Sequence, residues 1–268
     1  MRLQIFDVSH GFCAYLMANN GNVMLFDCGW NDETGFRPSN HLLRTGCNVI
    51  EHLIIQNFDQ DHVGDLPNIL AKIPVRVFYR NRSLTPSVLR SIKESSGPLT
   101  EAMQSAIDLH ATYVLPVAEP PIFPNIDFGL FFNSYPLFKD TNNLSLVVFI
   151  VYDGLGIVFP GDLETAGWKE LLKDDSFRAY LAKTTIFIAS HHGRTTGYCA
   201  DVFRYCRPEI IIVSDKEKVY DTQEQDYSKH ASGILWNGGP EKRYVLSTRA
   251  DGMITITKEV GTACEIAI

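Results

Sequence analysis

The sequence predicts an α/β fold in which two mixed β-sheets face each other and helices cover their outer faces, an αββα sandwich. Three observations support this prediction. Strand-like segments followed by helical segments occur once in each half of the 268-residue chain. Several apolar runs are continuous rather than alternating, as in strands that are buried on both faces. No linker or repeat divides the chain, so we expect a single domain over residues 1–268.

The first half begins with strands and continues into helices. Turn-forming residues such as Ser9–Gly11 separate the early strands. Leu66, Ile69 and Leu70 have the three-to-four-residue spacing of a helix. The same spacing recurs within 85–112, where Gly97–Pro98 interrupts it, and we interpret 83–125 as a helical insertion. The expected strands are 3–8, 13–18, 22–26, 49–56 and 75–79, and the expected first helix is 64–72.

The second half repeats this order after a loop with four prolines at 116–124. Continuous apolar runs such as Leu144–Tyr152 predict strands that lie inside the molecule. The expected strands are 126–132, 144–152, 155–159, 184–189, 209–213, 243–247 and 253–257, and the expected helices are 164–172, 198–205 and 226–235.

Composition excludes some classes of protein. Twenty-four Lys and Arg against 31 Asp and Glu leave a net charge of −7, which argues against a wholly basic nucleic-acid binder but not against a local basic groove. No apolar run approaches the roughly 18–20 residues of a membrane span, and no secretory signal is visible. The six cysteines include no C-x-x-C pair. We therefore expect a cytoplasmic protein with reduced, mostly buried thiols and no membrane partner; its oligomeric state stays open.

Three polar motifs follow buried strands. Asp59, Asp61 and His62 lie within four residues after the strand at 49–56, and carboxylates and imidazoles suit Zn²⁺, Mn²⁺ or Fe²⁺. Asp162 follows the strand at 155–159, and a histidine pair at 191–192 follows the strand at 184–189. The alternatives are an acidic turn that caps a helix, an N-cap at Asp162 and structural histidines. Together the motifs predict a site for one or two divalent cations.

These motifs in this order resemble the metallo-β-lactamase fold, and more narrowly the soluble ComEC-type competence hydrolase domain and its free-standing relatives. Asp7–Gly11, Leu25–Gly29, Asn142–Val147 and Thr248–Ile254 resemble further segments of that branch. The resemblance covers nearly the whole chain. It implies an αββα sandwich, a site for one or two metal ions and hydrolysis, commonly of phosphodiesters.

The resemblance also implies roles for individual residues. Asp162 corresponds to a carboxylate that bridges two ions, and one residue of the histidine pair to the last ligand. Asn57 stands where the family usually has His; its neutral amide should weaken the first ion, favour a harder cation or leave that position empty, and His10 could compensate. The implied ligand positions are Asn57 and Asp59 for the first ion, Asp61 and His62 for the second, and Asp162, His191 and His192.

Further residues are candidates for the reaction itself. Arg194, beside the histidine pair, could hold a phosphate, and Asn143 is a second candidate for substrate binding. His230 could contact substrate or donate a proton, or it could be a surface histidine. Asp61, His191 and His230 are the candidate catalytic residues.

The sequence thus predicts a metal-dependent hydrolase, a phosphodiesterase or nuclease in which a metal-bound hydroxide attacks phosphorus. The expected cofactor is Zn²⁺ or Mn²⁺, one or two ions per chain, and the expected substrate is a phosphoester, nucleic acid and nucleotides included. Two alternatives stay open. The chain could be a binding or partner module that has lost catalysis, or a hydrolase of lactones, thioesters or amides, because fold alone does not select the substrate.

Overall fold

The computed structural model describes residues 1–216, 222–236 and 239–268. Within these residues two sheets face each other, as the sequence predicts. The first has the order β15 (Glu265–Ala267), β14 (Ile254–Thr257), β1 (Arg2–Ile5), β2 (Ala14–Met17), β3 (Val23–Phe26), β4 (Ile50–Ile54) and β5 (Val75–Tyr79). The second has the order β13 (Val245–Ser247), β10 (Ile210–Val213), β9 (Ile186–Ile188), β8 (Leu155–Phe159), β7 (Leu146–Tyr152) and β6 (Ile126–Phe132). Strands β11 (Ile234–Leu235) and β12 (Lys242–Arg243) form a separate pair.

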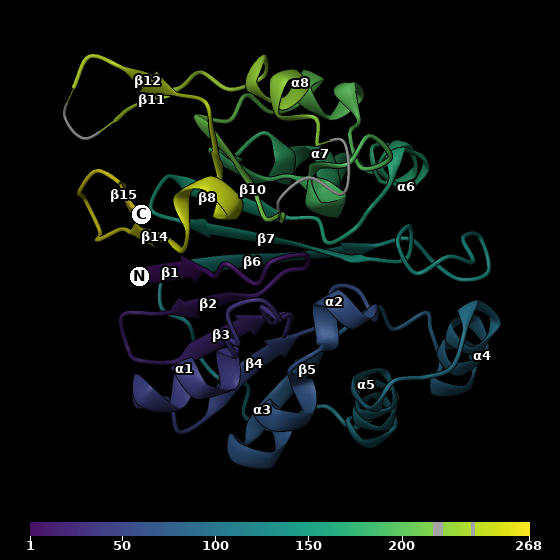
Figure 1. Cartoon of the computed structure of the whole chain (residues 1–268). Coiled ribbons are helices and arrows are strands. Elements are labelled where there is room, and N and C mark those ends of the chain that lie inside the picture. The colour runs from purple at the N-terminus through teal and green to yellow at the C-terminus, as the bar shows by residue number, and fades with distance from the viewer. Residues whose placement is uncertain (217–221, 237–238) are drawn as a thin grey trace.

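Helices cover the outer face of each sheet (Figure 1). Those that pack on the first sheet are α1 (Pro38–Arg44), α3 (Leu66–Lys72), α4 (Pro86–Ser96) and α5 (Glu101–Thr112). Those that pack on the second are α6 (Thr165–Leu171), α7 (Asp175–Leu181) and α8 (Glu224–Ser228). The shorter helices α2 (Gln60–Val63) and α9 (Thr248–Asp251) follow β4 and β13. A tight, non-helical turn occupies Ser190–Gly193, and a single 3₁₀ turn occupies Ala200–Arg204.

A central core lies between the two sheets. Ile5 of β1 and Ile150 of β7 belong to it, and Phe26 stacks on Phe159 with ring centroids 4.3 Å apart. Separate apolar clusters fill the spaces between each sheet and its helices. Strands such as β3, β4 and β8 are therefore buried along their whole length, which explains their continuous apolar runs.

Several elements differ from the expected ones. The helix predicted over 226–235 ends at Ser228, because Tyr227 is buried in the core and the amides of Ser232 and Gly233 bond instead to the carbonyls of Pro208 and Glu209. The chain then enters β11 rather than continuing as a helix. Elements α1, α2, α7, α9 and β15 were not expected. Helix α7 begins at an N-cap, since the Asp174 carboxylate accepts from the amide of Ser176 at 2.7 Å.

Parallel pairing brings several strand ends to one edge of the molecule. Strand β3 runs parallel to β4 in the first sheet, and β8, β9 and β10 are parallel in the second. Gln56, after β4, joins the two edges: its Nε2 donates to the carbonyl of Leu146 at 2.9 Å and to that of Phe159 at 2.6 Å. The segments that follow β3, β4, β8 and β9 therefore meet.

The cysteines are reduced and mostly buried, as the sequence predicts. Five of the six cysteines are buried and Cys264 is half-buried, and none is in a disulfide. Among the described residues, none of the helices combines the length and the apolar character that crossing a membrane requires.

The buried His52 of β4 makes stability depend on pH. Its ring packs against Tyr79 and Phe123, and neither ring nitrogen has a hydrogen-bond partner. Burial lowers the pKa of His52 from 6.5 to about 4. As pH falls from about 6.5 towards 4, the unfolded chain takes up a proton that the folded chain does not, so we expect a loss of about 2–3 kcal/mol of stability. Urea unfolding at pH 7 and 4.5 measures the free energy of unfolding of the wild type and of His52→Phe. The variant should lose less stability between these two pH values than the wild type does, and equal losses in both proteins would contradict the prediction.

Candidate metal centre

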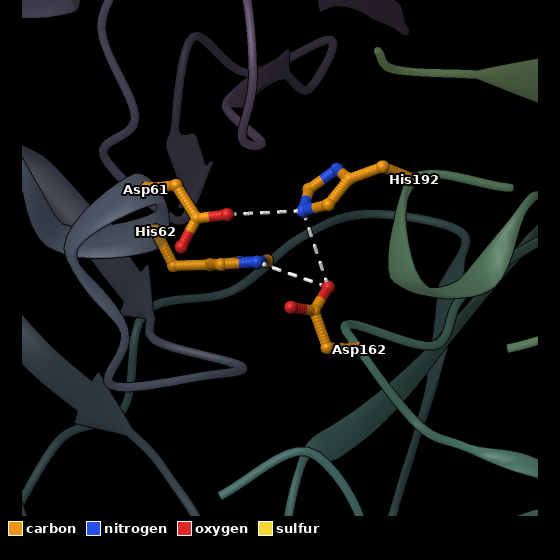
Figure 2. A group of neighbouring side chains, drawn as sticks. All are labelled: Asp61, His62, Asp162 and His192. Carbon is orange, nitrogen blue, oxygen red and sulfur yellow. Dashed lines mark ion pairs between the residues drawn. The ribbon is translucent and has the colours of Figure 1, made fainter. Parts of the chain in front are cut away.

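Four side chains converge at the edge where the strand ends meet (Figure 2). Asp61 and His62 belong to α2, Asp162 follows β8, and His192 lies in the tight turn after β9. One ligand atom from each lies within 4.8 Å of all the others. His62, Asp162 and His192 are buried, whereas the Asp61 side chain is 23% exposed and leaves one side of the group accessible.

The distances within this group fit a cation. His62 Nε2 lies 3.0 Å from Asp162 Oδ1, and His192 Nε2 lies 3.4 Å from the same atom and 3.2 Å from Asp61 Oδ2. Although these atoms are close together, the Nε2 atoms of His62 and His192 and the Oδ1 atom of Asp162 are buried and have no hydrogen-bond partner. A tetrahedral ion with ligand distances of about 2.0–2.2 Å separates its ligand atoms by about 3.4 Å. Two imidazoles and two carboxylates with these separations could hold one divalent cation.

Neighbouring acceptors determine which nitrogen of each imidazole faces the group. His62 Nδ1 lies 2.7 Å from Asp27 Oδ2, and His192 Nδ1 lies 2.9 Å from the backbone carbonyl of Ser214. A carbonyl can only accept, so His192 carries its proton on Nδ1; the Asp27 carboxylate favours the same tautomer at His62. In the neutral form that a metal ligand requires, each Nε2 therefore directs a lone pair towards the centre of the group.

Glycines allow two loops to pack closely against α2. A Cβ added at Gly11 would lie 2.2 Å from the carbonyl oxygen of Asp61, and one added at Gly29 would lie 2.5 Å from it. The amide of Phe12 donates to this oxygen, and that of Cys28 donates to the carbonyl of His62 at 2.6 Å. The loops after β1 and β3 thus hold the backbone of both α2 residues in place.

Strained backbone accompanies the site. Asp27, His191 and His192 have φ values of 54°, 51° and 55°. These values lie in the left-handed region, which residues other than glycine seldom adopt. Such residues persist where surrounding contacts maintain them, and they cluster at functional sites. At the histidine pair this conformation sends the two adjacent rings to different neighbours.

The electrostatics of the group also suit a cation. Burial by itself would lower the pKa of His62, but the carboxylates of Asp162, Asp27 and Asp61 raise it well above its usual value. Burial would likewise raise the pKa values of Asp61 and Asp162, but the adjacent histidines hold both well below the usual range. The buried group therefore attracts positive charge, and metal binding would release protons from its imidazoles.

Asn57 and Asp59, the predicted ligands of a first ion, lie outside this group of four. Asn57 Nδ2 donates to Asp162 Oδ2 at 3.3 Å and to Asn142 Oδ1 at 3.0 Å. Asp59 instead pairs with the ammonium group of Lys93 and accepts from Thr141 at 3.1 Å. Burial lowers the pKa of Lys93 to about 8, against the opposing influence of Asp162.

His191, Arg194 and His10 border the group. His191 Nδ1 lies 2.9 Å from Thr196 Oγ1, and its Nε2 accepts from Arg194. Arg194 also donates to His10 Nε2 at 2.8 Å, and the same nitrogen lies 3.3 Å from Asp61 Oδ2. Of the histidine pair, His192 is thus the member that faces the other three residues, while His191 orients the arginine beside them.

The other predicted site residues have different neighbours. Both polar atoms of the Asn143 side chain form hydrogen bonds: its Oδ1 accepts from the amide of Gly167, and its Nδ2 donates to Asp140. His230 lies 2.8 Å from the Tyr198 hydroxyl and stacks on Phe203 with ring centroids 4.0 Å apart. Neither contact involves the group of four.

Asp27, Ser214 and Lys93 contribute to the site although sequence reasoning did not count them among its candidate site residues. Asp27 belongs to the segment Leu25–Gly29 that resembles the family, and a buried acidic residue directly after a strand could have marked it. Ser214 acts through its backbone carbonyl and Lys93 comes from a distant helix, so neither had a local signal.

Comparison with known proteins places the chain in a family. Residues 14–198 match the model of the metallo-beta-lactamase superfamily. No curated protein sequence matches the chain. Similar solved structures include the short form of human tRNase Z (15% identity, TM-score 0.45, 83% of this chain and 95% of that chain) and a diphosphatase of the PhnP family (10%, 0.46, 96% and 98%). CmlA, a diiron β-hydroxylase from Streptomyces venezuelae, is also similar (12%, 0.45, 79% and 44%).

The family match covers more than half of the 268 residues and includes all four converging side chains. With its two facing sheets, its outer helices and this match, the chain belongs to the metallo-beta-lactamase superfamily, whose members are mostly metal-dependent hydrolases.

Proposed function

We propose that this chain hydrolyses phosphoesters with one divalent cation, Zn²⁺ or Mn²⁺, held by Asp61, His62, Asp162 and His192. The observation that supports it is the convergence of these side chains, with both Nε2 atoms buried and without hydrogen bonds. Imidazole nitrogen and carboxylate oxygen are ligands that both cations accept. When bound, the cation would supply Lewis-acid charge and lower the pKa of a coordinated water.

Charged groups beside the proposed centre favour an anionic substrate. Arg194 is half-buried next to His10 and His191, and its planar guanidinium can donate two parallel hydrogen bonds to phosphate oxygens. A lactone, thioester or amide carries no matching negative charge. In this proposal Arg194 binds and orients the phosphate, and His191, held by Thr196, positions Arg194.

The narrower assignments stay predictions. Resemblance to ComEC-type hydrolases depends on short segments such as Asp7–Gly11 and Asn142–Val147. Nuclease activity would require room for a polynucleotide beside Arg194, and the net charge of −7 provides no general attraction for one. The proposal therefore specifies a phosphodiester and leaves its leaving group open.

Replacing Arg194 tests the phosphate role. Hydrogen bonds to charged groups contribute about 1.5–3 kcal/mol, so we expect Arg194→Ala to raise KM for bis-p-nitrophenyl phosphate roughly 10–100-fold. Bound metal, measured by elemental analysis, should not change. Arg204→Ala is the matched control, because Arg204 is an exposed arginine whose ion pair is with Asp201.

A substrate panel tests the reaction class. Metal-loaded protein should hydrolyse bis-p-nitrophenyl phosphate, and single- and double-stranded DNA should be assayed in parallel with added Mn²⁺. Turnover of p-nitrophenyl acetate without turnover of any phosphodiester would contradict the proposal in favour of a carbonyl substrate. A chain that binds metal but hydrolyses neither would contradict it in favour of a binding module.

A further inference from the structure

Lys93 places a buried positive charge beside the proposed centre. It lies on α4, its side chain is 8% exposed, and its ammonium group pairs with the Asp59 carboxylate. It also interacts electrostatically with Asp162. Lysine is almost never buried to this degree unless it is paired, so the Asp59 carboxylate accounts for its position.

The surroundings of Lys93 do not fit a second metal ion. The Oδ1 of Asn57 accepts from the Asp59 backbone amide at 3.1 Å, which fixes the orientation of the side-chain amide. Its NH₂ group therefore faces Asn142 and Asp162, so it presents protons rather than a lone pair. Asp59 is likewise used by Lys93 and Thr141. The predicted first-ion ligands are thus committed to hydrogen bonds and an ion pair.

We propose that the Lys93 ammonium takes the place of a second cation, so that the chain binds one divalent ion and Lys93 positions Asp59. The inference rests on the proposed metal centre of Asp61, His62, Asp162 and His192. It assigns a role in the site to α4, a helix of the predicted insertion, and it makes Lys93 a positioning residue.

Charge balance supports this arrangement. At the implied ligand positions, the carboxylates of Asp59, Asp61 and Asp162 bring three negative charges, and ligating imidazoles are neutral. One divalent ion together with the Lys93 ammonium balances them. A second divalent ion next to Lys93 would add two positive charges beside an ammonium in a partly buried site, where like charges repel strongly.

Metal stoichiometry tests the proposal without any activity assay. Purified variants are loaded with Mn²⁺ or Zn²⁺, desalted and measured by elemental analysis, with thermal melting to show that each is folded. We expect one ion per chain in the wild type. Asn57→His, which provides the missing imidazole, should still bind one ion while Lys93 is present. Asn57→His combined with Lys93→Leu should bind two.

Two control variants separate charge from structure. Lys93→Arg in the Asn57→His background keeps the positive charge and should hold the stoichiometry at one. Arg90→Leu in the same background removes a charge from the exposed face of α4, where Arg90 pairs with Glu94, and should also leave it at one.

Two results would overturn the proposal: two ions in the wild type or in Asn57→His alone, or one ion in the double variant. These results are distinguishable from failure of the proposed function. A wild-type chain that binds one ion and hydrolyses no phosphodiester contradicts the function and supports the role of Lys93. A chain that hydrolyses phosphodiesters with two ions contradicts the role of Lys93 alone.

Discussion

Asp162→Asn is expected to abolish stable metal binding and to lower kcat/KM for a phosphodiester by at least about 10³-fold, equivalent to roughly 4 kcal/mol of transition-state stabilisation. The position of Asp162 between the two histidines is the reason for this expectation. Asp162 Oδ1 lies close to both His62 Nε2 and His192 Nε2, at 3.0 and 3.4 Å. An amide at this position keeps the shape of the side chain but removes the negative charge that the cation requires.

Elemental analysis and steady-state kinetics measure the two effects separately. Asp201→Asn is the control, since Asp201 is a partly exposed aspartate that pairs with Arg204. If Asp162→Asn retained one tightly bound ion and near-normal turnover, the metal centre would have to lie elsewhere.

Asp27→Asn is expected to weaken metal binding roughly 10–100-fold although Asp27 is not itself a member of the group. Its Oδ1 accepts from the Gln56 amide and its Oδ2 lies 2.7 Å from His62 Nδ1. In the variant, the asparagine oxygen would stay with Gln56 and its NH₂ would face His62. The ring would then have to accept at Nδ1, which moves its proton to Nε2 and turns the ligand atom into a donor.

A second buried aspartate separates this effect from a general loss of stability. Asp65 is fully buried and its carboxylate accepts from Arg37, Asn68 and the amide of Ser39, none of which belongs to the group of four. Asp65→Asn should lower the melting temperature and leave metal affinity unchanged. Calorimetric titration with Zn²⁺ or Mn²⁺ measures the metal affinity of both variants. Equal metal affinities in both would contradict the prediction for Asp27.

Much of the candidate site could be predicted because its residues follow buried parallel strands. Continuous apolar runs predicted strand ends at residues 56, 159 and 189, close to the observed ends at Ile54, Phe159 and Ile188, and polar residues follow each of them. Carboxyl ends of parallel strands collect at one edge, so residues far apart in the chain come together. This reasoning applies to Asp61, Asp162 and the histidine pair.

The choice within each motif was not predictable from spacing. His191 and His192 are adjacent and chemically identical, and only the left-handed backbone, with φ values of 51° and 55°, decides which ring faces Asp162. Spacing also could not distinguish Asp59 from Asp61. The folded chain distinguishes them, because Lys93 pairs with Asp59 while Asp61 belongs to the group of four. The sequence alone offered no reason to connect that lysine with this aspartate, since 34 positions separate them.

By itself, the sequence determined the αββα class and the edge at which polar residues gather, because hydrophobic burial and strand pairing depend on patterns that extend over many residues. The tertiary structure decided the partners of individual side chains: Asp27 with His62, Ser214 with His192, and Lys93 with Asp59. Such contacts depend on distances of about 3 Å between elements that are remote in the chain. Local patterns carry no information at that precision, so a proposal for the ligands and for the number of cations required the folded chain.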